Sequence, residues 1–395
     1  MSQRILVVYC GLLMSVSAFL VDITLPAFPT MVQEFSSPYA YVQWTLTIYT
    51  LSAGAGQLLW GSLSDRFGRR PILFFGLSLL LVGLVLAFFA PTIALLIAAR
   101  ILQGLGAAAA MVCSRAILRD LFSGKDLARN MAMASAVFAV GPIFAPFLGA
   151  VMIELAGWRS IFFCLSCLTL MLIGALFFFE ETSQFKDGQA LRLGRIRTNL
   201  VSLFTNPQSR FFLLVSMVSM AFMLVILTGV APMYESEFGI TGILFAGLFA
   251  IQGIFLIAGQ FVSRRLIHTL GIIPTIVVAS TVMAVMSGLF LALTVGNVLM
   301  VFMVPLVVGL ANSAFMVIYA NATSLVLDPH EDKAGFAVSV YGFASQMGGA
   351  AIVSVLVFFN NDQALGMSAL MLALSLIVFA ALLGWSARHK PVRET

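Results

Sequence analysis

Long apolar stretches recur along the whole chain and are separated by short polar segments. Each stretch holds about 20 predominantly apolar residues, the length that an α-helix needs to cross a hydrocarbon core of about 30 Å. The apolar residues are continuous and do not alternate with polar ones, which favours helices over a β-barrel. The pattern predicts spans over residues 5–27, 41–62, 72–90, 92–114, 131–153, 158–179, 211–233, 241–263, 272–294, 298–320, 336–359 and 367–386.

The composition of the chain agrees with this pattern. Of its 395 residues, 61% are hydrophobic and only 9% are charged, and the mean hydropathy is +1.07. A soluble protein with a polar surface does not reach these values. The expected fold class is therefore an all-α polytopic membrane protein with twelve transmembrane helices.

Basic residues lie mostly on one side of the predicted spans. Lysine and arginine in short loops stay on the cytoplasmic side of a membrane. The residues on the side of the N-terminus are Arg4, Arg66, Arg69, Arg70, Arg115, Arg119, Lys125, Arg129, Lys186, Arg192, Arg195, Arg197, Arg210, Arg264, Arg265, Lys333, Arg388, Lys390 and Arg393. Only Arg159 lies near the opposite side, and Arg100 lies inside a span.

We expect a multi-pass protein of the inner (plasma) membrane with both termini cytoplasmic. The same bias explains the net charge of +5, which therefore does not indicate nucleic-acid binding.

A long polar stretch near the middle of the chain predicts a division into two halves. It reads EETSQFKDGQALRLGRIRTNLVSLFTNPQSR over residues 180–210 and is rich in charged and turn-forming residues. A weak repeat supports the division, because Gly56 and Pro29 align with Gly259 and Pro232 at one offset. We predict an N-terminal six-helix bundle (1–180), a cytoplasmic linker (181–209), and a C-terminal six-helix bundle with a cytoplasmic tail (210–395).

The sequence contains no recognisable enzyme motif. HED at 330–332 lacks the second histidine of H-E-x-x-H because position 334 is alanine, and SGKD around Lys125 lacks the rest of a P-loop. The cysteines lie in or at the ends of spans, where CLSC without a second pair does not predict a metal site. We therefore expect no catalytic residue, no metal and no cofactor. Transport driven by an ion gradient is the leading class, with a receptor or scaffold as the alternative.

Three short motifs sharpen this prediction. GSLSDRFGRRPIL (61–73) connects the second and third spans, RILQGLGAAAAM (100–111) opens inside the fourth, and GPIFAPFLGA (141–150) places prolines and glycines inside the fifth. A positive-inside anchor explains the arginines of the first motif but not its aspartate and glycines, which favour a close-packed, charge-latched loop. The small residues of the second allow close helix approach, and the prolines of the third would bend or loosen their helix.

Together the motifs resemble those of the major facilitator superfamily, and specifically its twelve-span drug:proton antiporters. VDITLPAFP (21–29) is similar to the first-span motif of the Bcr/CflA-like drug resistance branch, although Ile23-Thr24 and Ala150 depart from the usual pattern. The resemblance implies two pseudo-symmetric six-helix bundles around a cavity lined by the first, fourth, seventh and tenth spans. It also implies a monomer that moves a small-molecule substrate against protons.

Asp22 and Arg100 are charged residues that lie well inside predicted spans, whereas Arg159 lies at the end of one. At 1.5 Å per residue, Asp22 lies roughly 9 Å and Arg100 roughly 12 Å from the same membrane surface. A lone charge costs about 2.5 to 3.5 kcal/mol at a helix centre, so each needs a partner or a wet cavity. We expect either an ion pair between them or competition of proton and substrate for Asp22. The alternatives are a kink-pinning role for Asp22 and a static brace for Arg100.

The remaining candidates fall into three groups. Polar residues inside spans, which are substrate-cavity candidates or helix-to-helix hydrogen bonds, are Tyr49, Gln57, Gln103, Gln252, Asn312, Tyr319, Tyr341 and Gln346. The expected cytoplasmic gate comprises Gly61, Asp65, Arg66, Gly68 and Arg69. The antiporter motif comprises Gly141, Pro142, Pro146 and Gly149.

The combined prediction is a proton-coupled secondary transporter that exports small amphipathic drugs, chloramphenicol- or bicyclomycin-like, by alternating access. Asp22 and Arg100 are the expected proton-coupling residues. The first alternative is an exporter or importer of a native metabolite such as a sugar, siderophore or nucleoside. The second, outside transport, is a membrane receptor or scaffold.

Overall fold

The structure is a computed structural model that describes residues 3–178, 180–183, 201–357 and 363–388. Each of the twelve predicted spans overlaps a helix in this part of the chain. The N-terminal helices are α1 (Gln3–Asp22), α3 (Tyr39–Phe67), α4 (Arg69–Phe88), α5 (Ile93–Leu121), α6 (Gly124–Ala156) and α7 (Arg159–Ala175), followed by η2 (Leu176–Phe178). The C-terminal helices are α9 (Pro207–Phe238), α10 (Gly242–Leu270), α11 (Ile272–Val295), α12 (Met303–Leu327), α13 (Ala334–Val357) and α14 (Gln363–Arg388), with η3 (Asp328–Lys333) before α13.

The length and apolarity of these helices support a membrane location. Nine helices among the described residues are long and apolar enough to cross a membrane. Together with the all-helical architecture, this confirms the predicted fold class. Most of the predicted linker (181–209) and the tail after residue 388 lie outside the described residues, so those domain boundaries stay predictions.

The first span is broken, although its apolar pattern predicts a continuous helix over 5–27. Helix α1 ends at Asp22, a short 3-10 helix η1 (Leu25–Ala27) follows, and α2 (Phe28–Phe35) completes the segment. Pro26 and Pro29 each stand in the first turn of a new helix, where a missing N–H is tolerated. The prolines therefore turn the end of this span into three short elements directly after Asp22.

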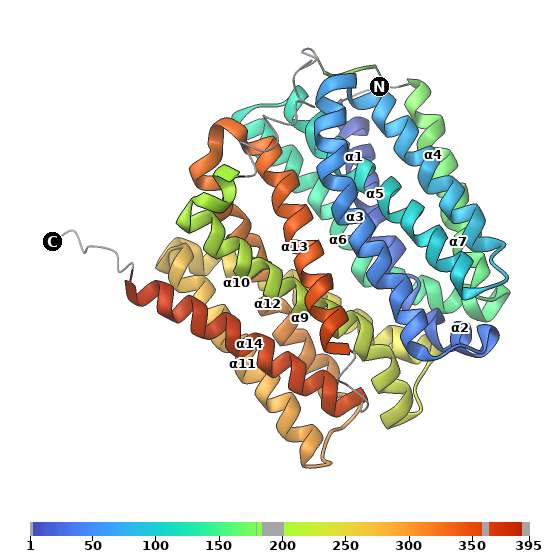
Figure 1. Cartoon of the computed structure of the whole chain (residues 1–395), viewed down its shortest axis with the longest axis vertical. Coiled ribbons are helices and arrows are strands. Elements are labelled where there is room, and N and C mark those ends of the chain that lie inside the picture. Colours follow the sequence, from blue (N-terminus) through green and yellow to red (C-terminus); the bar gives the residue numbers. More distant parts are fainter. Residues whose placement is uncertain (1–2, 179, 184–200, 358–362, 389–395) are drawn as a thin grey trace.

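The helices form two groups that occupy the two sides of the molecule (Figure 1). Within the first group α5 packs on α3, α4 and α1, while α1 packs on α6 and α4 on α7. Within the second, α9 packs on α12, α13 and α14, α10 packs on α12, and α11 packs on α12 and α14. The groups meet where α3 packs on α13 and α6 packs on α10. Figure 1 shows α3 and α13 side by side at this interface.

The glycines of RILQGLGAAAAM (100–111) explain why α5 lies at the centre of the first bundle. A Cβ at Gly104 would collide with the Tyr49 carbonyl of α3, and a Cβ at Gly106 would lie 2.6 Å from the Gly76 carbonyl of α4. Glycine on two faces of α5 therefore lets two neighbouring helices approach closely at the same level. This packing fixes the position of Arg100, which lies one turn earlier on α5.

The two bundles contact each other at the end of the molecule near Asp22. We call the end at which α1 begins the N-terminal face, and the other end the opposite face. At the opposite face η1 contacts α9 and α10 of the second bundle, and Gln43 Nε2 of α3 donates a 2.9 Å hydrogen bond to the Thr228 carbonyl of α9. The bundles are therefore joined at the opposite face, close to Asp22.

Candidate functional site

Asp22 is a buried carboxylate at the C-terminal end of α1. It is 6% exposed, and its side chain makes no hydrogen bond or ion pair with any residue in the described part of the chain. The turn that follows it is held tightly, because a Cβ at Gly149 of α6 would collide with the Ile23 carbonyl. The carboxylate thus lies between a fixed turn and the contacts of η1 with the second bundle.

Arg100 of α5 is almost completely buried, at 1% exposed, and it binds the end of α1. Its Nη1 donates to the Leu20 carbonyl at 3.1 Å, and its Nη2 donates to the Thr24 hydroxyl at 2.9 Å. The Leu20 carbonyl belongs to the last turn of α1, where carbonyls lack helical partners and carry partial negative charge. The guanidinium therefore caps this helix end through its two terminal nitrogens, while its buried Nε has no hydrogen-bond partner among the described residues.

The predicted ion pair between Asp22 and Arg100 is absent from the structure. The two residues lie at similar depth, as expected, but the guanidinium faces the Leu20 carbonyl and the Thr24 hydroxyl instead. Thr24 is a hydrogen-bond partner of Arg100 that the sequence interpretation missed. Its presence in place of an apolar or aromatic residue of the resembled motif was the available signal.

Gln103 and Tyr49 support Arg100 from within the first bundle. Gln103 Oε1 accepts from Arg100 Nη1 at 2.9 Å, and its Nε2 donates to the Gly83 carbonyl of α4 at 2.9 Å. Arg100 also lies 5.9 Å from the Tyr49 ring centroid, and the Tyr49 hydroxyl bonds to Ser17 of α1. These predicted cavity residues are committed to helix-to-helix contacts in this conformation, which was the alternative interpretation.

The predicted cavity residues of the second bundle divide into paired and unpaired groups. The Tyr319 hydroxyl bonds to Ser345 at 3.0 Å, and the Tyr341 hydroxyl donates to Ser216 at 3.0 Å, so both phenols are satisfied. Buried polar atoms without a partner occur on Gln252, Asn312 and Gln346. An unpaired buried amide is costly, so these three residues are the stronger candidates for contact with a polar group of cargo.

Gln57 of α3 lines a cavity between the two bundles. The cavity has a volume of about 90 Å³, and its walls are Gln57, Met111, Val112, Arg115, Arg119, Met131 and Val338. Arg119 lies two residues before the end of α5, which places the cavity toward the N-terminal face. Gln57 therefore lines a cavity, and its contact with substrate stays a prediction.

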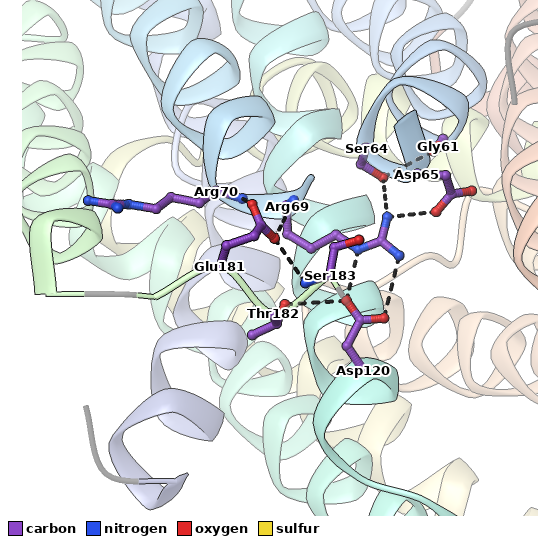
Figure 2. Close-up of polar contacts among 9 residues, drawn as sticks. All are labelled: Gly61, Ser64, Asp65, Arg69, Arg70, Asp120, Glu181, Thr182 and Ser183. Atoms are coloured by element: carbon purple, nitrogen blue, oxygen red, sulfur yellow. Dashed lines mark hydrogen bonds and ion pairs between the residues drawn. The ribbon is translucent and has the colours of Figure 1, made fainter. Parts of the chain in front are cut away.

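The predicted gate is organised around Arg69 at the start of α4 (Figure 2). Its guanidinium contacts Asp65 at 2.6 Å and Asp120 at 2.9 Å, and donates to the Ser64 hydroxyl at 3.0 Å. The Ser64 hydroxyl in turn donates to the Gly61 carbonyl. We call Asp65, Arg69 and Asp120 the Arg69 cluster. It joins the ends of α3 and α5 at the N-terminal face through one cation.

Glu181 completes this region from a distant part of the chain. Its carboxylate accepts from the backbone N–H groups of Arg69 and Arg70 at 2.9 and 3.1 Å, which caps the N-terminus of α4. Gly68 has a φ of 103°, and a Cβ there would collide with the Glu181 carboxylate. Both the backbone conformation and the space therefore require glycine at position 68.

Two parts of the gate prediction need correction. Arg66 is exposed, lies 5.3 Å over the Phe67 ring, and makes no ion pair among the described residues. Asp120 and Glu181 were not predicted as members. They lie 51 and 112 residues from Arg69 in the sequence, and the only signal was a carboxylate at the end of each apolar stretch.

The antiporter motif lies on α6 and packs against α1. A Cβ at Gly141 would meet Ala18 at 3.4 Å, an ordinary contact, whereas one at Gly149 would collide with the Ile23 carbonyl. Pro146 is buried, and the side chain of Pro142 lies outside the described residues. Because α6 also packs on α10, the motif connects the end of the first span to the interface between the bundles.

Arg159, the exception to the basic-residue bias, has a local explanation. Its guanidinium pairs with Glu34 of α2 and donates to the Ala90 carbonyl at 2.8 Å. The Glu34 carboxylate also accepts from the indole N–H of Trp158. This contact fastens α2 to the start of α7 at the opposite face.

These features define a class of protein. Two helical bundles meet around a cavity, buried charges lie inside the spans, and the bundles pack on each other chiefly through α3 with α13 and α6 with α10. That architecture is the one used by membrane transporters that alternate access between two sides.

Comparison with known proteins identifies the family. The family model described as Major Facilitator Superfamily matches residues 10–353, so the chain belongs to this superfamily. A bicyclomycin resistance protein homolog of Haemophilus influenzae is 28% identical over 367 residues, covering 92% of this chain and 91% of the relative. The multidrug resistance protein MdtL of Escherichia coli is 28% identical over 333 residues, covering 83% and 82%.

A solved structure supports the fold. The human organic anion transporter MFSD10 superimposes with a TM-score of 0.70, covering 96% of this chain and 99% of that chain, at 18% sequence identity. The predicted membership of the superfamily is confirmed, and the protein is a multi-span membrane transporter and not an enzyme.

Proposed function

We propose that the protein exports small amphipathic compounds across the inner membrane in exchange for protons, with the N-terminal face in the cytoplasm. The observation that carries this proposal is the buried, unpartnered carboxylate of Asp22 beside the contacts that join the bundles. The names of the two bacterial relatives, both resistance proteins, support export of drugs.

The position of Asp22 suits a proton carrier. Burial without a partner disfavours the charged carboxylate, so the closed arrangement at the opposite face favours a bound proton. Separation of η1 from α9 and α10 would bring water to the end of α1 and let the carboxylate exchange its proton with the outside. The same separation would open the cargo path, which couples proton exchange to the change of access.

Arg100 acts in this proposal as a positioning residue. Its hydrogen bonds to Leu20 and Thr24 hold the last turn of α1 and the turn after it, on either side of Asp22. The carboxylate therefore keeps one position while the second bundle moves away from it. This replaces the direct ion pair that equal depth suggested.

The Arg69 cluster would stabilise one of the two states at the cytoplasmic side. It contains one cation between two carboxylates, and Asp65 is 49% exposed. Partial solvation makes such an ion pair weak enough to rearrange during a transport cycle. We assign this cluster to gating and not to cargo binding.

A susceptibility panel tests the proposed function. Cells that lack their own exporters express the wild-type protein or Asp22→Asn at equal level and are challenged with several unrelated amphipathic drugs. Raised tolerance with the wild type and its loss with the variant is the expected result. A growth change on one nutrient alone, without any change in drug tolerance, would indicate transport of a native metabolite and contradict the proposal. Reporter fusions to the termini test the orientation separately.

A further inference from the structure

The cavity between the bundles contains a cationic surface that the fold was not expected to place there. The apolar pattern ends the fourth span at residue 114, which leaves Arg115 and Arg119 in a cytoplasmic loop. Helix α5 instead continues to Leu121. Met111, Arg115 and Arg119 are spaced by four residues, so they form one stripe on α5, and all three line the cavity.

Arg115 and Arg119 lack, among the described residues, the ion pairs that hold Arg69 and Arg159. Arg69 contacts two carboxylates and Arg159 contacts Glu34. No ion pair or hydrogen bond joins either cavity arginine to the residues that the structure describes. Arg119 is exposed, whereas Arg115 is half-buried. A half-buried cation without a partner in a membrane protein commonly marks a path or binding site for a substrate.

The surroundings of Arg115 suit an amphipathic ligand. Met111, Val112, Met131 and Val338 supply apolar walls, and methionine side chains adapt to ligands of varied shape. Gln57 adds a neutral polar group. Val338 belongs to α13 of the second bundle, whereas the other walls belong to the first. The site is therefore bounded by both bundles and changes when they move.

The size of the cavity limits what it holds in this conformation. Its volume of about 90 Å³ is well below the roughly 300 to 1,000 Å³ of a pocket for a drug-sized ligand. It has room for a charged group such as a carboxylate, a sulfonate or a phosphate. The apolar body of the ligand would occupy the space created when the bundles separate.

We infer that this cavity binds the anionic group of an amphipathic cargo through Arg115, with Arg119 at its mouth attracting anions from the N-terminal face. The inference rests on the proposed export function and specifies one substrate class for it. A planar guanidinium matches the two oxygens of a carboxylate, and the apolar wall accounts for the rest of the molecule.

A binding measurement with a matched pair of probes tests this inference. Purified full-length protein in nanodiscs of phosphatidylcholine, which has no net charge, is titrated with coumarin-3-carboxylate and with coumarin-3-carboxamide. The wild type should bind the carboxylate more tightly than the carboxamide, and that affinity should fall as salt rises. Arg115→Gln should weaken carboxylate binding about 10- to 100-fold, as expected for loss of a charged hydrogen bond. Carboxamide binding should stay within about 2-fold.

Arg66→Gln is the matched control, because it removes one exposed positive charge from the same face without touching the cavity. It should leave the binding of both probes unchanged. If Arg115→Gln does not fold, Arg115→Lys keeps the charge but loses the planar fork and should show a smaller loss. Arg119→Gln provides a second variant.

Two outcomes would overturn the inference. One is equal affinity of the wild type for the two probes, and the other is an equal loss of both probes in Arg115→Gln, which would make Arg115 a structural brace. The binding assay uses no gradient, so it is independent of the susceptibility panel. Failure of drug export with intact carboxylate binding would refute the proposed function and leave the anion site standing.

Discussion

Arg100 of α5 donates a 2.9 Å hydrogen bond to the hydroxyl of Thr24, two residues after the buried carboxylate of Asp22. The same guanidinium donates to the Leu20 carbonyl, two residues before it. One cation thus holds both sides of the turn at which the first span breaks. Asp22 itself is left without a partner among the described residues, and in our proposal it is the group that exchanges a proton.

Replacing Thr24 with valine should destabilise the protein. Valine has a similar shape but no acceptor, so it leaves one N–H of the buried Arg100 unpaired, at a cost of about 1 to 3 kcal/mol. The midpoint of thermal unfolding in detergent should fall. Thr24→Ser keeps the hydroxyl and should unfold close to the wild-type temperature. Equal unfolding temperatures for the valine and serine variants would contradict the capping role of Arg100.

Asp22→Asn should abolish uphill export driven by a pH gradient while leaving the fold intact. Asparagine keeps the size and hydrogen-bonding capacity of the side chain but removes the exchangeable proton. Reconstituted vesicles with an imposed proton gradient provide the measurement. Asp126→Asn, which removes an exposed carboxylate from the first turn of α6, should transport normally. Retained uphill export by Asp22→Asn would mean that the residue only pins the helix end.

The Arg69 cluster should govern turnover and not affinity. Asp65→Asn and Asp120→Asn each remove one of the two carboxylates that hold Arg69, so each should slow transport and leave cargo binding largely unchanged. Unfolding free energy should fall by no more than about 1 kcal/mol for the half-exposed Asp65. Arg66→Gln should behave as the wild type in the transport assay. Loss of binding at unchanged turnover would refute the gating assignment.

The two glycines of the antiporter motif should respond differently to a methyl group. Gly149→Ala places a Cβ against the Ile23 carbonyl and must displace the turn after Asp22, whereas Gly141→Ala meets Ala18 at an ordinary 3.4 Å. We expect Gly149→Ala to lose proton-driven export and Gly141→Ala to retain most of it. The larger Gly141→Leu should also stall exchange. The same vesicle assay at equal reconstitution measures all three, and wild-type export by Gly149→Ala would remove the proposed role of this contact.

The sequence alone determined the features that depend on local chemistry. Each span is a run of apolar residues long enough to cross a bilayer, and this property belongs to one segment at a time. Loop motifs are also local, so Asp65, Gly68 and Arg69 were correctly predicted to form a close-packed, charged connection. Family membership followed from the same short motifs.

The tertiary structure decided which side chains meet. Position in a span fixes the depth of a residue but not the direction of its side chain around the helix, so the similar depths of Asp22 and Arg100 did not make them a pair. The break caused by Pro26 and Pro29 gave Arg100 a helix end to cap. The close packing of α5 at Gly104 and Gly106 placed Arg100 beside that helix end.

The partners of Arg69 that are distant in the sequence, and the point at which α5 ends, likewise could not be predicted from the sequence. Asp120 and Glu181 join Arg69 because three helix ends converge at the N-terminal face, and no spacing in the chain specifies that convergence. Arg115 lines the cavity because α5 continues to Leu121, several residues past the end of its apolar stretch. Contacts with neighbouring helices extend α5 beyond the point at which hydropathy predicts its end. Hydropathy measures the preference of a segment for lipid, whereas the extent and rotation of a helix are set by the helices around it.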